Sequence, residues 1–298
     1  MRFEGVYTAL ITAFHKSGTG IDEKITARLI ERQIEAGVTG IILGGSTGEG
    51  QTLELNEIEN LIKVAKAFKG KIQIMGACGF SGTQQTADRY AWLCKNEVDA
   101  VLISTPPYNK APQRGLVRHF QEIAKLGDKP IMAYNIPGRT AVNLLPSTMK
   151  DIWKISQIAA LKESSGSIEQ IQQSLYEMPQ GKSLFCGDDP LSLSVWALGA
   201  SGTVSVLSNI CPKALVTQWK AWKSGKISEA QEIQKKMMTL TQHLFVESNP
   251  IPTKFCMGQI LKTELNPRLP LVSLDEAHHL KLKESLKLAA SEGFCEAL

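Results

Sequence analysis

Short runs of apolar residues alternate with longer amphipathic segments as far as about Gly225. Several of these runs are almost continuously apolar, as is typical of parallel strands covered on both faces. They are Ile41–Gly44, Ala100–Ser104, Pro130–Asn135 and Ile158–Lys162. In all, the pattern predicts strands that begin near Gly5, Gly40, Ile72, Ala100, Pro130, Ile158, Ser183 and Gly202.

The amphipathic segments between these strands are predicted to be helices. They cover Asp22–Ala36, Asn56–Phe68, Thr83–Asn96, Gln113–Lys125, Ser167–Leu175 and Asp188–Ala197. Asp22 and Asn56 are suitable N-caps, and Glu59 follows Asn56 at capping-box distance. Eight strand–helix units of the α/β class predict a closed (β/α)8 barrel, the TIM barrel. The alternative, a doubly wound open sheet, usually carries a glycine-rich dinucleotide turn after its first strand, and Ala13–Asp22 does not match that turn.

Beyond about Gly225 the strand pattern stops. Ser228–Phe245, Pro252–Lys262 and Leu274–Glu292 have helical patterns, with prolines between them. We therefore expect residues 1–224 to form a barrel catalytic domain and residues 225–298 to form a small C-terminal helical extension.

Charge and hydropathy exclude two classes of partner. The formal net charge of +4 is small for 298 residues, and basic residues do not cluster, so no nucleic-acid footprint is expected. The apolar run at the N-terminus is interrupted by Glu4, Tyr7 and Thr8, which favours a first strand over a signal peptide. No segment reaches the ~20 apolar residues that a membrane span needs.

The six cysteines are widely scattered and form neither a CxxC pair nor a cluster with histidine at metal-ligand spacing. The expected state is reduced thiols in a cytoplasmic protein without a metal site.

The active site of a (β/α)8 barrel lies at the carboxyl ends of its strands. The polar segments expected there are Gly44–Gly50, Thr105–Asn109, Tyr134–Thr140, Lys162–Gly166 and Cys186–Asp189.

Lys162 ends an apolar strand, so its amine should project into the barrel mouth from surroundings of low dielectric constant. Desolvation disfavours the charged ammonium, and the neutral amine is the form that attacks a ketone. The structural alternative is a lysine paired with a carboxylate such as Glu163.

Three other strand-end features admit a chemical and a structural interpretation. Ser46 and Thr47 lie in a glycine-flanked turn. Its backbone amides could hold a carboxylate, or the segment could be only a tight turn. A phosphate cradle is weakly supported, because the P-loop and GxGxxG patterns are absent. Tyr134 could shuttle protons or simply pack, and Arg139 could bind a carboxylate or be solvated.

Four motifs together resemble the dihydrodipicolinate synthase family. They are GSTGE at 45–49, YNIPGRT at 134–140, LKESSG at 161–166 and GDD at 187–189. The GSTGE loop and the strand-six lysine are shared with the wider pyruvate-dependent aldolase superfamily. Arg139 points within it to the synthase, because similar N-acetylneuraminate lyases typically lack this arginine.

The resemblance implies a class I, Schiff-base-forming lyase of lysine and diaminopimelate biosynthesis. Lys162 would condense with pyruvate, whose carboxylate the backbone amides of Ser46 and Thr47 would hold. The enamine would then attack L-aspartate 4-semialdehyde. No metal or organic cofactor is implied, since the protonated imine is the electron sink.

The remaining roles also follow from the resemblance. Tyr134 and the Thr47 hydroxyl would relay protons together with Tyr108, which reaches in from a neighbouring subunit in the family, where a homotetramer (a dimer of dimers) is usual. Arg139 would bind the carboxylate of the semialdehyde. Gly187 and Val204 match backbone positions that line the pocket.

Two features depart from the family pattern. Ser46 stands where the synthase usually has threonine, a change that a backbone contact would survive. Positions that match the lysine-inhibition pocket of the family include the apolar Leu55, Ile58 and Pro107, beside Ser81 and Gln85. Apolar side chains donate no hydrogen bonds, so we expect lysine to inhibit weakly or not at all.

Two alternative functions stay open at this point. One is an aldolase of the same superfamily acting on N-acetylneuraminate or a 2-keto-3-deoxy sugar acid. The other is a non-catalytic barrel that binds a keto acid.

Overall fold

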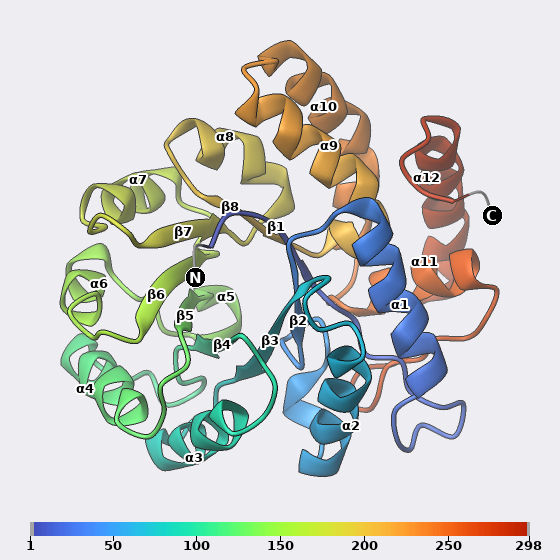
Figure 1. Cartoon of the computed structure of the whole chain (residues 1–298). Helices are drawn as coiled ribbons and strands as arrows, with labels where there is room; N and C mark the ends of the chain where they lie inside the picture. The colour runs from blue at the N-terminus through green and yellow to red at the C-terminus, as the bar shows by residue number, and fades with distance from the viewer. Residues whose placement is uncertain (1–2, 297–298) are drawn as a thin grey trace. The chain divides into compact units, whose positions relative to one another are not determined.

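The computed structural model describes residues 3–296, and within this range eight strands form a closed parallel barrel in sequence order (Figure 1). The strands are β1 (Gly5–Ala9), β2 (Gly40–Leu43), β3 (Gln73–Cys78), β4 (Ala100–Ser104), β5 (Ile131–Asn135), β6 (Ile158–Glu163), β7 (Ser183–Cys186) and β8 (Gly202–Ser205). The barrel confirms the predicted fold class, and each strand begins within one residue of its predicted start.

Helices follow the strands as predicted. They are α1 (Glu23–Ala36), α2 (Leu55–Lys66), α3 (Thr83–Cys94), α4 (Gln113–Ala124), α5 (Pro137–Thr140), α6 (Pro146–Ile152), α7 (Ile168–Tyr176), α8 (Ser192–Ala197), α9 (Pro212–Lys223), α10 (Ile227–His243), α11 (Ile251–Leu261) and α12 (His279–Ser291). The sequence pattern did not predict α5, α6 or α9. Each of these three helices begins with proline, a residue that marks turns as readily as first helical positions.

The N-cap prediction was right for α1 and wrong for α2. The Asp22 side chain accepts a hydrogen bond from the backbone N–H of Ile25 (2.9 Å). In α2 the N-cap is Glu54 and not Asn56, and the Glu57 carboxylate accepts from the Glu54 N–H (3.0 Å). The helix starts earlier than predicted because Glu54 and Glu57 form a capping box ahead of the predicted Asn56–Glu59 pair.

The chain divides into two compact units, of which the first takes the residues up to Gly5 together with Ile74–Val204. Its strands β3 to β8 pair in parallel with their sequence neighbours. Figure 1 shows α3, α4, α6 and α7 lying outside these strands. The side chains of β5 are buried along its whole length, as expected of a strand covered on both faces.

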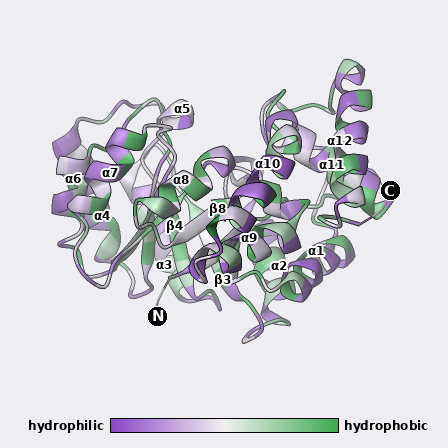
Figure 2. Ribbon diagram, turned by 90° about the horizontal axis from the view of Figure 1, so that it is seen from above, coloured by the Kyte–Doolittle hydropathy of each residue, from purple (hydrophilic) through white to green (hydrophobic). Residues whose placement is uncertain are grey.

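The second unit takes Val6–Gln73 and the chain from Ser205 onward. In it β1 pairs in parallel with β2, and α10 packs against both α9 and α12. Figure 2 shows hydrophilic and hydrophobic residues alternating along α12, whose buried side includes Leu282 and Leu286. By contrast, α11 buries nine of its eleven residues, which is typical of a core helix. Among residues 3–296 no helix has the length and hydropathy needed to cross a bilayer.

Candidate functional site

Lys162 lies near the carboxyl end of β6, and only 5% of its surface is exposed. Strand pairing places Tyr134 of β5 directly opposite Lys162, so the two side chains share one face of the sheet. The Lys162 Nζ lies 4.1 Å from the centroid of the Tyr134 ring. The structure thus brings together the two residues predicted as nucleophile and proton shuttle.

Gly187 follows β7 and lies against the Lys162 side chain. A Cβ at position 187 would lie 2.9 Å from the Lys162 Cε and would overlap the Ser164 hydroxyl. The close approach explains why a glycine stands at this strand end, since any other residue would place a side chain against Lys162. The backbone of Gly187 therefore lies next to the lysine side chain. Val204, the other predicted backbone contact, is buried in β8.

Asp188 adds an acid to the surroundings of Lys162. Burial raises the pKa of the Asp188 carboxyl above its ordinary value, Asp189 adds to the rise, and the charge of Lys162 opposes it. The sequence pattern placed Asp188 in a strand-end motif but assigned it no role.

Glu163 does not pair with Lys162. Consecutive strand residues face opposite sides of a sheet, and the Glu163 carboxylate accepts hydrogen bonds elsewhere. Its donors are the Asn135 Nδ2 (3.0 and 3.1 Å), the Ser165 N–H (2.7 Å) and the Gln170 Nε2 (3.3 Å). Burial raises the pKa of the Glu163 carboxyl, against the lowering effect of these donors. Glu163 therefore links β6 to β5 through Asn135, and the Lys162 amine lies on the opposite face of the strand.

Arg139 lies in α5 and Tyr108 lies in the loop after β4, and a backbone hydrogen bond joins the two segments. Arg139 is exposed on α5, and Tyr108 is 87% exposed. The N–H of Tyr108 donates to the carbonyl oxygen of Thr140 (3.2 Å). Tyr108 has a φ of +72°, a left-handed conformation that non-glycine residues adopt rarely and that is common at functional loops.

The Gly44–Gly50 loop, which follows β2, belongs to the second unit. Ser46 is half-buried in it, whereas Thr47 is only 3% exposed. The Thr12 hydroxyl donates to the carbonyl oxygen of Gly48 (2.7 Å), and a Cβ on Gly48 would lie 2.9 Å from the Leu10 carbonyl oxygen. The loop is therefore held tightly against the segment that follows β1.

Asn249, which no sequence pattern singled out, contacts Thr47. Its Nδ2 donates to the Thr47 Oγ1 (2.9 Å), and its Oδ1 accepts from the Thr253 hydroxyl (3.2 Å), which fixes the orientation of the amide. Because the Thr47 oxygen accepts this bond, its own hydrogen is directed to another acceptor. The residues adjoining Asn249 indicated only a proline turn, so no local signal could have identified it.

Glu49 of the same loop is anchored by a buried lysine that sequence reasoning also missed. Lys254 of α11 is 0% exposed and forms an ion pair with Glu49, while its Nζ lies 4.1 Å from the centroid of the Phe14 ring. The Arg268 N–H also donates to the Glu49 carboxylate (2.8 Å). Burial lowers the pKa of Lys254 to about 8, with Glu49 opposing the change.

Among residues 3–296 no three His, Cys, Asp or Glu side chains lie close enough together to ligate a metal ion. The buried Lys162 amine and the Tyr134 hydroxyl of the first unit are groups that serve in covalent and acid–base catalysis.

Comparisons with known proteins cover almost the whole chain. The sequence profile of the Dihydrodipicolinate synthetase family matches residues 2–289. The 4-hydroxy-tetrahydrodipicolinate synthase of Leptospira biflexa is 38% identical over 275 residues, or 92% of this chain and 93% of that protein. The crystal structure of dihydrodipicolinate synthase from Thermotoga maritima superimposes with a TM-score of 0.94 at 33% identity, covering 97% and 99% of the two chains. A monomeric dihydrodipicolinate synthase variant has the same TM-score and identity, with 97% of each chain covered.

Proposed function

The chain belongs to the dihydrodipicolinate synthetase family, and on this premise we propose that it condenses pyruvate with L-aspartate 4-semialdehyde through a Schiff base on Lys162. The observation that carries the proposal is the burial of the Lys162 amine against the Tyr134 ring and the Gly187 backbone. The product would be 4-hydroxy-tetrahydrodipicolinate, which places the enzyme in lysine and diaminopimelate biosynthesis.

The first half of the reaction forms the imine. The neutral Lys162 amine attacks the ketone carbon of pyruvate to give a carbinolamine, which loses water. Tyr134 stands beside the amine and would carry the proton that the departing hydroxyl needs. The protonated imine then withdraws electrons, so that the pyruvate methyl group loses a proton and becomes an enamine.

The second half forms the carbon–carbon bond. The enamine carbon attacks the aldehyde of the semialdehyde, whose oxygen takes up a proton. The amino group of that substrate then closes the ring on the imine carbon and displaces Lys162. The lysine amine is regenerated.

The loop residues supply binding and proton transfer in this proposal. The amides of Ser46 and Thr47 bind the pyruvate carboxylate, and the Thr47 hydroxyl takes part in the proton relay. Support for the relay comes from Asn249, which donates to the Thr47 oxygen and leaves the hydroxyl hydrogen for another acceptor. Gly187 and Val204 line the pocket through their backbone.

Tyr108 is assigned to a neighbouring copy of the chain. Its 87% exposure supports a side chain that is available to a neighbouring subunit. We therefore propose a homotetramer arranged as a dimer of dimers, in which each Tyr108 completes the proton relay of the adjacent subunit.

Replacing Arg139 with alanine should raise KM for L-aspartate 4-semialdehyde by roughly 10- to 100-fold, the effect of losing a charged hydrogen-bonded carboxylate contact. KM for pyruvate should stay within about twofold of wild type. Steady-state assays with each substrate varied in turn measure both constants, and Arg114→Ala on the exposed face of α4 is the matched control.

The same assay separates the candidate substrates. Efficient condensation with the semialdehyde, and none with N-acetylneuraminate or 2-keto-3-deoxy sugar acids, is the expected outcome. Turnover of a sugar acid with no activity on the semialdehyde would replace the proposal by the aldolase alternative.

Changing Asn249 to aspartate should lower kcat by roughly 10²-fold at little cost in KM for either substrate, a loss expected when one proton-relay group is misdirected. Aspartate has the same shape but accepts the Thr47 hydroxyl proton, so the hydrogen bond reverses. Asn96→Asp, which makes the same change at a residue whose amide donates to the Trp92 carbonyl oxygen, is the control and should stay near wild type. A wild-type kcat in Asn249→Asp would mean that Asn249 has only a packing role.

A further inference from the structure

Ser164, the residue that follows β6, has a buried hydroxyl oxygen without a hydrogen-bond partner. None of residues 3–296 donates to this Oγ or accepts from it. Most buried polar groups in folded proteins are paired, and a group that is not paired lowers stability. Alanine has nearly the same shape and would avoid this cost. The hydroxyl therefore needs an explanation in the chemistry around it.

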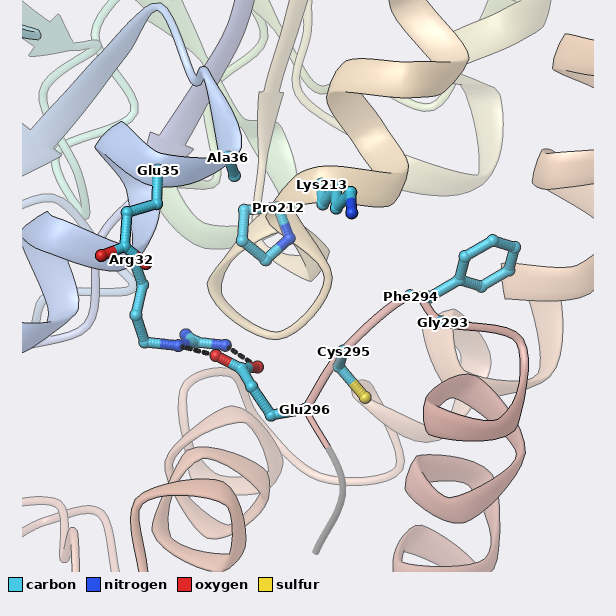
Figure 3. Close-up of a pocket in the computed structure, with 9 residues that line it drawn as sticks. All are labelled: Arg32, Glu35, Ala36, Pro212, Lys213, Gly293, Phe294, Cys295 and Glu296. Atoms are coloured by element: carbon cyan, nitrogen blue, oxygen red, sulfur yellow. Dashed lines mark hydrogen bonds and ion pairs between the residues drawn. The ribbon is translucent and has the colours of Figure 1, made fainter.

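The cavity drawn in Figure 3 shows the usual arrangement of a buried polar group. There the buried Arg32 guanidinium binds the Glu296 carboxylate through two hydrogen bonds of 2.6 and 2.5 Å. Arg32 also donates to the carbonyl oxygen of Asn209 (2.9 Å). This buried charge has its partners within the chain, so nothing at the cavity requires a ligand.

Strand geometry places the Ser164 side chain on the same face as Lys162. The Ser164 N–H donates to the carbonyl oxygen of Asn135 (2.9 Å), and the Gly187 N–H donates to that of Glu163 (2.9 Å), so the strand pairing continues past the end of β6. Side chains two residues apart on a strand share a face. A Cβ at position 187 would lie 1.9 Å from the Ser164 Oγ and 2.9 Å from the Lys162 Cε. The hydroxyl and the end of the lysine side chain therefore border the same small space beside Gly187.

We propose that Ser164 is a further catalytic residue, whose hydroxyl accepts a hydrogen bond from the protonated imine nitrogen that Lys162 forms with pyruvate. This inference rests on the proposed function. The free amine lies 4.1 Å from the centroid of the Tyr134 ring, whereas the protonated imine keeps one N–H in the plane of its double bond. A buried cation needs a hydrogen-bond acceptor in that direction. Rotation about the last side-chain bonds of Lys162 brings the nitrogen to the Ser164 oxygen, and no covalent bond of the serine changes.

Ser164→Ala should lower the pH at which the imine loses its proton by about one unit, since a hydrogen bond to the charged form favours that form. Sodium cyanoborohydride reduces the protonated imine. The adduct on Lys162 is therefore trapped with pyruvate from about pH 6 to about pH 10 and quantified by peptide mass spectrometry. Trapping should decline at lower pH in the variant than in wild type. The kcat should fall roughly tenfold, and the Tm should be equal or higher because the unpaired hydroxyl is gone.

The titratable groups near the imine are the same in the wild type and the variant. Within the first unit they are Tyr134 of β5 and Asp188 after β7, whereas Glu163 lies on the opposite face of β6. A difference in the pH profile therefore reports on the serine. Ser165→Ala is the matched control, because the Ser165 hydroxyl already accepts from the Ser167 N–H (3.3 Å). It should keep the wild-type pH profile.

Two failures of this experiment are distinguishable. An adduct that declines at the same pH in Ser164→Ala as in wild type would overturn the role of Ser164 and leave the Schiff base intact. If the Tm of the variant were also lower, the hydroxyl would only pack against Gly187. A folded wild-type protein that forms no adduct at any pH would instead contradict the proposed function.

Discussion

Lys162→Ala should lose at least about 10⁴-fold in kcat, because the variant has no amine with which to form the imine. Lys162→Arg should lose as much, although it keeps the positive charge, because the guanidinium stays protonated near neutral pH and does not form an imine with a ketone. Circular dichroism and Tm should show both variants folded. Steady-state turnover of pyruvate and L-aspartate 4-semialdehyde measures the loss.

The comparison variant is Lys154→Ala, which removes a lysine whose side chain is 73% exposed. It should retain wild-type activity. If Lys162→Arg kept a tenth or more of wild-type turnover, Lys162 would act through its charge and the covalent mechanism would be wrong.

Lys254→Met should lower the free energy of unfolding by about 3–5 kcal/mol, since it leaves the Glu49 carboxylate buried without its cation. The double variant Glu49→Gln/Lys254→Met removes both charges and should recover most of that loss. Urea unfolding of the wild type, both single variants and the double variant completes the cycle. Additive losses would mean that the ion pair is not the unit that holds the Gly44–Gly50 loop.

The pKa of Lys254 adds a dependence on pH to this prediction. Burial lowers that pKa to about 8 from 10.5, so between these values the unfolded chain binds a proton that the folded chain does not. Stability contributed by Lys254 therefore rises with pH across this window. The gap between the wild type and Lys254→Met should widen by roughly 2 kcal/mol from pH 7.5 to pH 9.5. A gap that is constant with pH would contradict the assigned shift.

The strands were predictable because a parallel strand covered on both faces is an almost continuous apolar run. Such a run can be recognised in the sequence without knowing which strands it pairs with. The run Ile158–Lys162 predicted β6, and the structure places that strand at Ile158–Glu163. Helix starts were less predictable where several neighbouring residues can serve as the N-cap, as Glu54 and Asn56 can at the start of α2. Glu54 caps α2 although asparagine is the better N-cap by type, because the Glu57 carboxylate accepts from the Glu54 N–H and completes a capping box there.

The residues around Lys162 were predictable for a similar reason. Lys162, Tyr134 and Gly187 each end or follow a strand, and the barrel topology assembles strand ends at one rim. Asn249 and Lys254 are different, because they lie on or next to a C-terminal helix. Each contacts a loop about two hundred positions earlier in the chain. Contacts of that range leave no periodic trace in the sequence, so only the folded structure shows them.

A covalent bond between pyruvate and Lys162 defines the proposed mechanism, and borohydride trapping detects that bond. Wild-type protein, Lys162→Ala and Lys154→Ala would each be incubated with pyruvate, reduced with sodium borohydride and mapped by peptide mass spectrometry. A reduced pyruvate adduct is expected on Lys162 in wild type and in Lys154→Ala, and none in Lys162→Ala. A folded wild-type protein without an adduct, or one modified equally at other lysines, would contradict the Schiff-base mechanism.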